Sequence, residues 1–370
     1  MRSDYSDAFH GQLAGRAIAE WKKPLWSDYY FPSGTVILSS ASHAVGSAYV
    51  HKALAVNKDP KLAVEGKSVA ALDGLEAFRA CYPQEVEKGT FEGEVGYFNP
   101  HCGWANARGA MDAICARVRA AGVSFAVGEA ASLVYEGEGA GKDVKGVRTK
   151  AGETSTADFV VLATGSWTAA LLPEMGPELL ATGQVVATIQ LTQEEADQYR
   201  SGPVSLCMDT GFYCFPVRRS PADSARSHPR SQPTADNIIK FAIHGNGFLN
   251  PSPSLPGFPS VPRTTSTPGC SADQIPREAV QALRDGLARI HPSLLAKKWA
   301  GTRICWCVLA RPFLFGFARA DAILFVGTAT ALPPTGCWTS TLPTPLSSSQ
   351  PATAGTASKS VLPLSPPLLN

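Results

Sequence analysis

The segment Asp158–Trp167, DFVVLATGSW, constrains the fold of this 370-residue chain more than any other part of it. Phe159–Leu162 is a run of large apolar residues, which is typical of a strand buried on both faces in a parallel sheet. The small residues Ala163, Thr164 and Gly165 follow it, so a flat ligand could approach the backbone there. The segment predicts an α/β fold with a ligand-binding turn at the end of a strand.

The composition limits the classes of function. With 44% hydrophobic residues, the chain can bury a core large enough for two domains. A net charge of +2, spread along the chain, argues against a nucleic-acid partner. The sequence has no run of eighteen apolar residues and no signal-peptide core, so we expect no membrane partner and a location in the cytoplasm or peroxisome. Nine cysteines without paired CxxC spacing argue against disulfides and a metal site.

Apolar periodicity predicts the remaining elements. The predicted helices are Phe9–Trp21, Met111–Val118 and Ile275–Ile290. Ser6 or Asp7 can cap the first helix, and Gly122 is placed to end the second. Pro276 opens the third helix. The predicted strands, besides Phe159–Leu162, are Ser124–Val127, Ser132–Tyr135, Val144–Arg148, Val185–Leu191, Phe212–Val217 and Ile238–His244.

Three further motifs accompany DFVVLATGSW. They are GYFNPHCGWANA (Gly96–Ala107), IIKFAIHGNGFLN (Ile238–Asn250) and GTRICWC (Gly301–Cys307). In this order and spacing, the four motifs resemble the fungal fructosyl-amine oxidases (amadoriases) and their sarcosine-oxidase-like relatives. These are FAD enzymes of the D-amino-acid-oxidase superfamily, and the resemblance covers Arg2 to Cys307.

The resemblance implies a two-domain α/β (α+β) fold. An incomplete FAD-binding domain with a parallel sheet would be interleaved with a substrate domain built on an antiparallel sheet. The first would comprise residues 1–30, 96–182 and 301–307, and the second residues 31–95 and 183–300.

The sequence also departs from the family. No GxGxxG turn, which holds the FAD pyrophosphate at a helix N-terminus, occurs in it, so we expect the chain to be truncated at its N-terminus. The codons of Gln350–Ser360, read one nucleotide back, permit ATGNGGHGFKV, which is close to the family's loop over the flavin. We therefore expect the reading frame to be lost between Cys307 and Trp338, and residues 308–370 to be an aberrant, disordered tail.

Lys240 is the candidate catalytic residue. Strand alternation places Lys240, Ala242 and His244 on one face, with Lys240 and His244 about 13 Å apart along the strand. The resemblance implies that Lys240 lies beside the flavin and helps the reduced flavin react with O2, because a fixed cation stabilises developing superoxide charge. The alternative is a solvated lysine on an exposed sheet face.

Cys305 resembles the cysteine to which many of these enzymes attach FAD covalently through a thioether. Arg303, on the same strand face, could favour the thiolate that such attachment needs. Cys307 lies on that face too and is the rival candidate. The alternative for Cys305 is a buried structural cysteine, the commonest fate of this residue.

Other cofactor-binding candidates come from the predicted turn. The resemblance places Ala163, Thr164, Gly165 and Trp167 next to the flavin, although Trp167 fits equally well as a core residue. Ala131, in the strand that follows the second helix, matches a position where the family's backbone contacts FAD.

His244 bears on the substrate, because sugar-specific amadoriases have an acidic residue at this position. We therefore expect FAD-dependent oxidation of a secondary amine or N-alkyl amino acid, sarcosine-like or fructosyl-amino-acid-like, with O2 as acceptor and hydrogen peroxide as product. FAD would supply the redox chemistry. The main alternative is an inactive fragment of such an oxidase that cannot bind FAD. A nicotinamide-dependent dehydrogenase is disfavoured, because no dinucleotide fingerprint occurs in the sequence.

Overall fold

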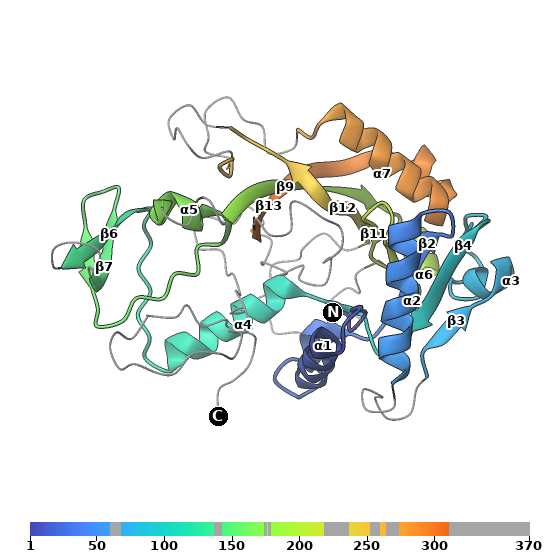
Figure 1. The fold of residues 1–370 in the computed structure, drawn as a ribbon, viewed down its shortest axis with the longest axis horizontal. Helices are drawn as coiled ribbons and strands as arrows, with labels where there is room; N and C mark the ends of the chain where they lie inside the picture. Colours follow the sequence, from blue (N-terminus) through green and yellow to red (C-terminus); the bar gives the residue numbers. More distant parts are fainter. Residues whose placement is uncertain are drawn as a thin grey trace, which may run out of the picture.

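A large mixed sheet organises the molecule (Figure 1). The computed structural model describes residues 1–59, 68–136, 143–173, 176, 179–217, 237–251, 260–263 and 274–310. The sheet has eight strands in the order β13-β9-β12-β11-β10-β2-β4-β3, and all neighbours are antiparallel except β10 and β2. Its strands are β2 (Thr35–Ser40), β3 (Ala70–Leu72), β4 (Glu94–Asn99), β9 (Leu179–Gln190), β10 (Val204–Cys207), β11 (Phe212–Cys214), β12 (Ile238–Phe248) and β13 (Trp299–Ala310).

Smaller sheets and helices complete the described part of the chain. β1 (Tyr30–Phe31) pairs with β5 (Trp104–Ala105), and β6 (Ala130–Glu136), β7 (Asp143–Thr149) and β8 (Thr154–Thr156) form an antiparallel sheet. The α-helices are α1 (Ala8–Trp21), α2 (Ala44–Lys58), α3 (Gly74–Arg79), α4 (Ala107–Ala120), α5 (Thr168–Leu171), α6 (Gln193–Tyr199) and α7 (Arg277–Ile290). The 3₁₀ turns are η1 (Ser27–Tyr29), η3 (Gly165–Trp167) and η6 (Pro292–Ala296).

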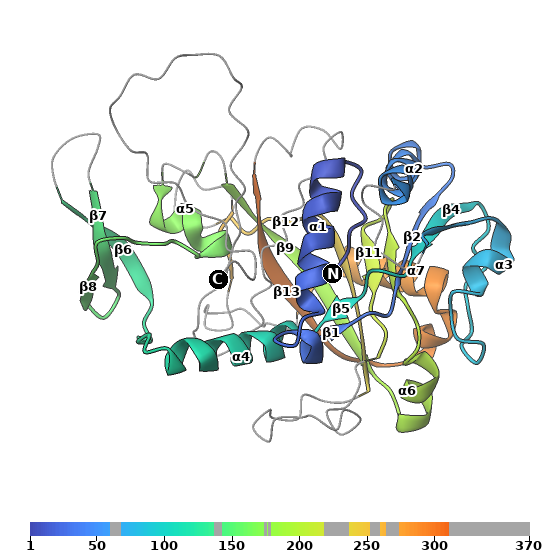
Figure 2. The ribbon, with the colours of Figure 1, turned by 90° about the horizontal axis from the view of Figure 1, so that it is seen from below.

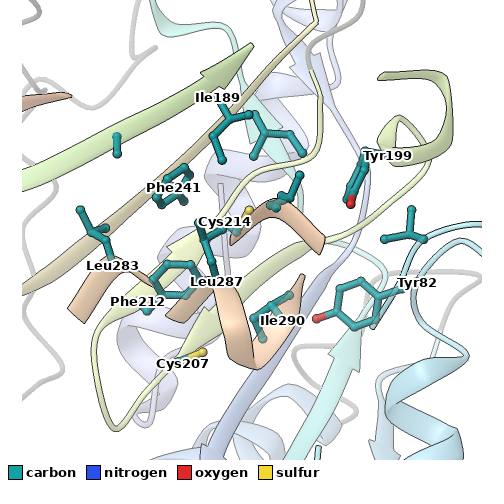
Figure 3. Packing of buried hydrophobic residues seen from close by; sticks show 14 of the residues in the cluster. Tyr82, Ile189, Tyr199, Cys207, Phe212, Cys214, Phe241, Leu283, Leu287 and Ile290 are labelled. Atoms are coloured by element: carbon teal, nitrogen blue, oxygen red, sulfur yellow. The ribbon is translucent and has the colours of Figure 1, made fainter. Parts of the chain in front are cut away.

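The main core lies between α7 and one face of the large sheet (Figure 3). Leu283, Leu287 and Ile290 of α7 are completely buried against the sheet. Burial of each such side chain contributes about 2 kcal/mol. Gly286 allows the helix to approach the sheet closely, because a Cβ at this position would lie only 2.1 Å from the ring of Phe212. Figures 1 and 2 show α1 and α4 on the opposite side of the sheet from α7.

Most predicted elements are present. α1 is capped by Asp7, whose carboxylate accepts a hydrogen bond from the His10 N–H at 2.9 Å. α4 ends just before Gly122, which has φ +88°, and α7 begins directly after Pro276. The α/β class is confirmed. The strands predicted at 132–135, 144–148, 185–191, 212–217 and 238–244 correspond to β6, β7, β9, β11 and β12.

The prediction of a buried strand at Phe159–Leu162 is wrong. This segment has no regular secondary structure, and the side chains of Phe159 and Val161 are 82% and 66% exposed. A segment becomes part of a buried sheet only when other strands pair with its edges. In the described part of the chain, no strand pairs with Phe159–Leu162. The strand predicted at Ser124–Val127 is also absent, because this segment has no regular secondary structure, and Val127 is 71% exposed.

The expected domain boundaries fall inside the large sheet. The boundary between residues 95 and 96 lies within β4, and residues 301–307 belong to β13, which pairs with β9. Residues 308–310, the start of the expected tail, continue β13, whereas residues 311–370 lie outside the described residues. The assignment of residues to two domains stays a prediction.

Candidate active site

Lys240 and His244 lie on the face of the large sheet that points away from α7. In β12 the side chains alternate, and Ile239 and Phe241 belong to the core beneath α7. Lys240 is paired with Thr188 of β9, and Ala242 with Val186, so these side chains share the opposite face.

Cys305 joins the same face from β13. It is paired with Gln184 of β9, two residues from Val186. Val186, Ala242 and Cys305 form a buried cluster, against which Tyr213 of β11 packs. Because β9 lies between β12 and β13, two strand spacings of about 4.8 Å each separate the strands of His244 and Cys305. Lys240, His244 and Cys305 therefore share one sheet face, and the β9 partners of Lys240 and Cys305, Thr188 and Gln184, are four residues apart.

Aromatic rings support the Lys240 ammonium. Its Nζ lies 5.3 Å from the centre of the Phe215 ring, and the Phe215 ring packs edge-on against Tyr213 at 5.4 Å. The Phe215 N–H donates a hydrogen bond of 2.9 Å to the Lys240 carbonyl, which fixes the two backbones together. The ring face attracts the cation and holds it on a half-buried surface.

The positive charge of Arg2, at the start of the chain, acts on His244. Burial, assisted by the positive charge of Arg2, lowers the pKa of His244 from 6.5 to about 4. His244 is therefore neutral at pH 7. The Arg2 guanidinium lies 4.8 Å from the centre of the Tyr5 ring, and its Nη1 donates to the carbonyl of Asp4 at 2.8 Å and to the Tyr49 hydroxyl at 3.4 Å.

A buried polar network anchors this N-terminal segment. The carboxylate of Asp4 is fully buried and accepts hydrogen bonds from the Tyr97 hydroxyl at 3.0 Å and the Asn99 amide at 2.8 Å. The Cys102 thiol donates to the same carboxylate at 3.4 Å. The network ties the residues that follow Arg2 to β4, so the position of Arg2 is well defined.

The predicted turn forms η3 and contacts β13. Gly165 is buried and has φ +54°, a conformation that favours glycine. The Ser166 hydroxyl donates to the carbonyl of Trp306, the neighbour of Cys305, at 3.3 Å. Ala163, Thr164 and Trp167 are half-buried around this contact. The turn therefore lies against the strand that carries the thiol.

Ala131 is not brought to this site. It lies exposed in β6, within the three-stranded sheet, and Figure 1 shows that sheet at the far end of the molecule from β12. Cys307, by contrast, shares the face of Cys305, is paired with Thr182 and is 6% exposed.

Sequence reasoning missed Arg2 and Tyr213. Burial, together with the nearby thiols of Cys305 and Cys307, raises the pKa of the Tyr213 hydroxyl. Tyr213 packs against the buried cluster that contains Cys305. Strand alternation from Phe212, a core residue, was the available signal for Tyr213. Arg2 gave no such signal, because its place depends on tertiary contacts.

No helix in the described part of the chain is both long enough and apolar enough to cross a bilayer.

Comparison with known proteins gives the family. The model of the FAD dependent oxidoreductase family (DAO) matches residues 2–338. L-saccharopine oxidase of Schizosaccharomyces pombe is 25% identical over 320 residues, which are 83% of this chain and 68% of that protein. Amino acid oxidase fsqB of Aspergillus fumigatus is 29% identical over 220 residues, covering 54% of this chain and 43% of that protein.

Solved structures agree with this assignment. Amadoriase I from Aspergillus fumigatus, a fructosyl amine:oxygen oxidoreductase, superposes with a TM-score of 0.65 at 25% identity, over 84% of this chain and 64% of that chain. The chain thus spans about two thirds or less of the length of these relatives. With the family model matched along most of its length, the chain belongs to the DAO family of FAD-dependent oxidoreductases.

Proposed function

We propose that this chain uses FAD to oxidise a secondary amine or an N-alkyl amino acid, with O2 as acceptor and hydrogen peroxide as product. One observation carries the proposal. Lys240, His244 and Cys305, from two strands on either side of β9, share the sheet face opposite the core. A cation, a neutral imidazole and a thiol on one face match what amine oxidation with a covalently held flavin requires.

The residues of this face fit a flavin ring. Val186, Ala242 and Cys305 make an apolar floor of small side chains, and Tyr213 borders it. Such a floor can pack against a planar ring, and the thiol within it is the group that would form the thioether. In this proposal η3, with Ala163, Thr164, Gly165 and Trp167, borders the cofactor from the side of β13.

When bound, FAD would supply the redox chemistry, the two-electron oxidation of the bond between the amine nitrogen and its neighbouring carbon, and water would hydrolyse the resulting imine. Lys240 holds a fixed positive charge at the face, where it stabilises the negative charge that develops as O2 is reduced. His244 is neutral at pH 7 and can bind the substrate as a hydrogen-bond partner.

The names of the relatives support a substrate of this class. They include an L-saccharopine oxidase and a fructosyl amine oxidase, and the second amadoriase of Aspergillus fumigatus has been solved in complex with FSA. His244 stands where sugar-specific amadoriases have an acidic residue, so the proposal stops at a secondary amine.

The second candidate is an inactive fragment that does not bind FAD. The exposed segment at Phe159–Leu162 favours it, because FAD domains of the Rossmann type bind the dinucleotide at the ends of paired parallel strands. The absence of a GxGxxG turn from the sequence points the same way.

Purification in the presence of FAD separates the two candidates. The oxidase should be yellow, should keep its flavin after acid precipitation, and should form hydrogen peroxide from secondary amines. A folded protein that stays colourless after incubation with FAD would establish the second candidate. The Cys305→Ser variant serves as the control, since it should bind FAD but release it on denaturation.

A further inference from the structure

Strand β12 has a wide bulge that begins at His244. Its pairing with β9 changes register between Ile243 and Phe248. The four residues 244–247 of β12 lie opposite a single residue of β9, Gln184. A bulge bends its strand and redirects the side chains that it carries, and bulges are frequent beside active sites. The position of His244 therefore depends on what holds this bulge in place.

The side chain of Gln184 replaces the missing strand pairing. Its Oε1 accepts a hydrogen bond from the Gly245 N–H at 3.0 Å, and its Nε2 donates to the Gly245 carbonyl at 3.1 Å. Nε2 also donates to the Thr182 hydroxyl at 3.1 Å. The acceptor and both donors of the carboxamide are thus used. Gln184 is 4% exposed, so the loss of these partners would leave buried polar groups unpaired.

His244 itself is held from the other edge of β12. Its N–H donates to the Gly211 carbonyl at 2.9 Å, in the turn before β11. Gly211 has φ +72°, and a Cβ there would collide with the His244 carbonyl, so this position favours glycine. Because β12 lies between β9 and β11, contacts from both neighbours fix two consecutive residues of the bulge.

Gln184 belongs to the face of the sheet that carries the candidate site. Its partner on β13 is Cys305, so the two side chains lie on the same face. The backbone of Gln184 is therefore paired with the strand of the thiol, while its side chain binds the bulge that carries His244. One residue of β9 connects the two outer strands at this point.

We propose that Gln184 positions His244 against the substrate, through its two hydrogen bonds to Gly245. The inference rests on the proposed function for the role of His244 and adds the residue that fixes its place. A side chain that binds a substrate through hydrogen bonds must be held close to its productive position. Gln184 is too deeply buried to meet the substrate, and acts through His244.

A double-mutant cycle on the KM for N-methylglycine tests the inference in the flavin-loaded protein. Gln184→Met keeps the length of the side chain but removes its hydrogen bonds, and should raise KM about tenfold. His244→Leu should raise it by a similar factor. The double variant should be no worse than either single variant, because both act through one contact. Factors that multiply in the double variant would overturn the inference.

Reoxidation of the reduced flavin by O2 separates positioning from general disruption. The proposed function assigns this step to Lys240, whose partner on β9 is Thr188 and which precedes the bulge. Gln184→Met should therefore leave the reoxidation rate close to that of the wild-type protein while KM rises. Equal loss in both steps would show that Gln184 only maintains the fold, and would contradict its assignment to His244.

NMR of isotope-labelled histidine gives a readout that does not depend on flavin or turnover. The His244 signals are those that His244→Leu lacks. The wild-type protein should give one sharp set, whereas Gln184→Met should broaden or split it, because the imidazole samples several positions. Unchanged His244 signals in folded Gln184→Met would overturn the inference. A protein that forms no peroxide but shows this change would contradict the proposed oxidase and support the positioning of His244.

Two further variants complete the experiment. Thr182→Val is the matched control, because it removes one hydrogen bond of the same carboxamide but leaves both bonds to Gly245, and its KM should stay close to the wild-type value. Gly247→Ala replaces Gln184→Met if that variant does not fold. Gly247 has φ +70°, and a Cβ there would collide with the Gln184 Nε2, so the carboxamide must move and KM should rise.

Discussion

The Lys240 ammonium lies 5.3 Å from the centre of the Phe215 ring, which joins the candidate catalytic cation to the neighbouring strand. Lys240→Met should slow reoxidation of the reduced flavin by O2 about 100-fold, because the fixed charge near the developing superoxide is lost. Stopped-flow mixing of reduced protein with O2 measures this step. Reduction by the amine should change much less, and an unchanged reoxidation rate would remove Lys240 from the proposed role.

Phe215→Leu provides the matched control for that experiment. It keeps the charge of Lys240 but removes the ring beneath it, a contact worth about 0.5–1 kcal/mol. Reoxidation should therefore slow by only a few-fold.

The two neighbouring thiols should behave differently towards flavin. Cys305→Ser should abolish flavin retention after denaturation, whereas Cys307→Ser should preserve it, because the proposal assigns the thioether to Cys305. In-gel fluorescence of the denatured protein under ultraviolet light measures retention. The reverse pattern would transfer the attachment to Cys307, which lies on the same face of β13.

Arg289 should be the most sensitive charged residue of the main core region. Its guanidinium makes two hydrogen bonds to Glu94, at 2.6 and 2.5 Å, and one to Asp209 at 2.8 Å. Arg289→Met leaves two nearly buried carboxylates unpaired, so the free energy of unfolding should fall by about 3–5 kcal/mol in urea denaturation. The surface pair of Arg108 and Asp112 is the control, and Arg108→Met should change stability by less than about 1 kcal/mol.

The same ion-pair cluster should weaken in acid. Burial alone would raise the pKa of Asp209, but hydrogen bonds from Arg289 and the Ser40 N–H outweigh it, so the pKa is lowered below 3.8. A carboxylate with a lowered folded-state pKa stabilises the protein above its unfolded pKa. The contribution of Asp209 to the free energy of unfolding should disappear as the pH falls below about 4. Urea denaturation at several pH values measures it, and the Arg289→Met variant should lack this pH dependence.

His291 should make stability depend on pH in a higher range. It is 6% exposed between the rings of Tyr82 and Tyr199, and burial lowers its pKa from 6.5 to about 4. Between these values only the unfolded chain binds the proton, so the contribution of His291 to the free energy of unfolding should fall by about 1.4 kcal/mol for each pH unit below 6.5.

His291→Phe should remove the part of the pH dependence of the free energy of unfolding that protonation of His291 causes. His244 contributes in the same direction, so His244→Gln should remove a similar share independently. A slope that neither substitution changes would contradict the burial of both imidazoles.

The stability of a Phe159 variant tests whether this side chain is exposed, as in the structure, or buried, as the sequence pattern predicted. A buried strand would make Phe159→Ala cost about 3–5 kcal/mol. Because the side chain is 82% exposed, we expect a change within about 0.5 kcal/mol. Phe241→Ala, at a fully buried position of β12, is the control and should cost the larger amount.

The part of the site on β12 was predictable because its alternation follows from simple packing. Ile239 and Phe241 must face α7, and this leaves Lys240 and His244 on the other side. The same argument applies to β13, where Cys305 and Arg303 are two residues apart. A period of two residues is a local property, so the sequence alone reveals it.

The rest depended on contacts that no local pattern encodes. The apolar run at Phe159–Leu162 was indistinguishable from a buried strand, because pairing partners, and not hydrophobicity, decide whether such a run is covered. The unpaired Nε atoms of Arg2 and Arg303 are likewise properties of the folded chain. Sequence reasoning proposed Arg303 only as a neighbour of the thiol.

β9 pairs with β12 along one edge and with β13 along the other. The backbone hydrogen bonds of β9 to both strands therefore set the distance between Lys240 on β12 and Cys305 on β13. Substitutions of side chains can change the chemical groups that contact a ligand, but they do not change the distance between these strands. Divergence on this scaffold should therefore select ligands by their end groups and preserve the span between them.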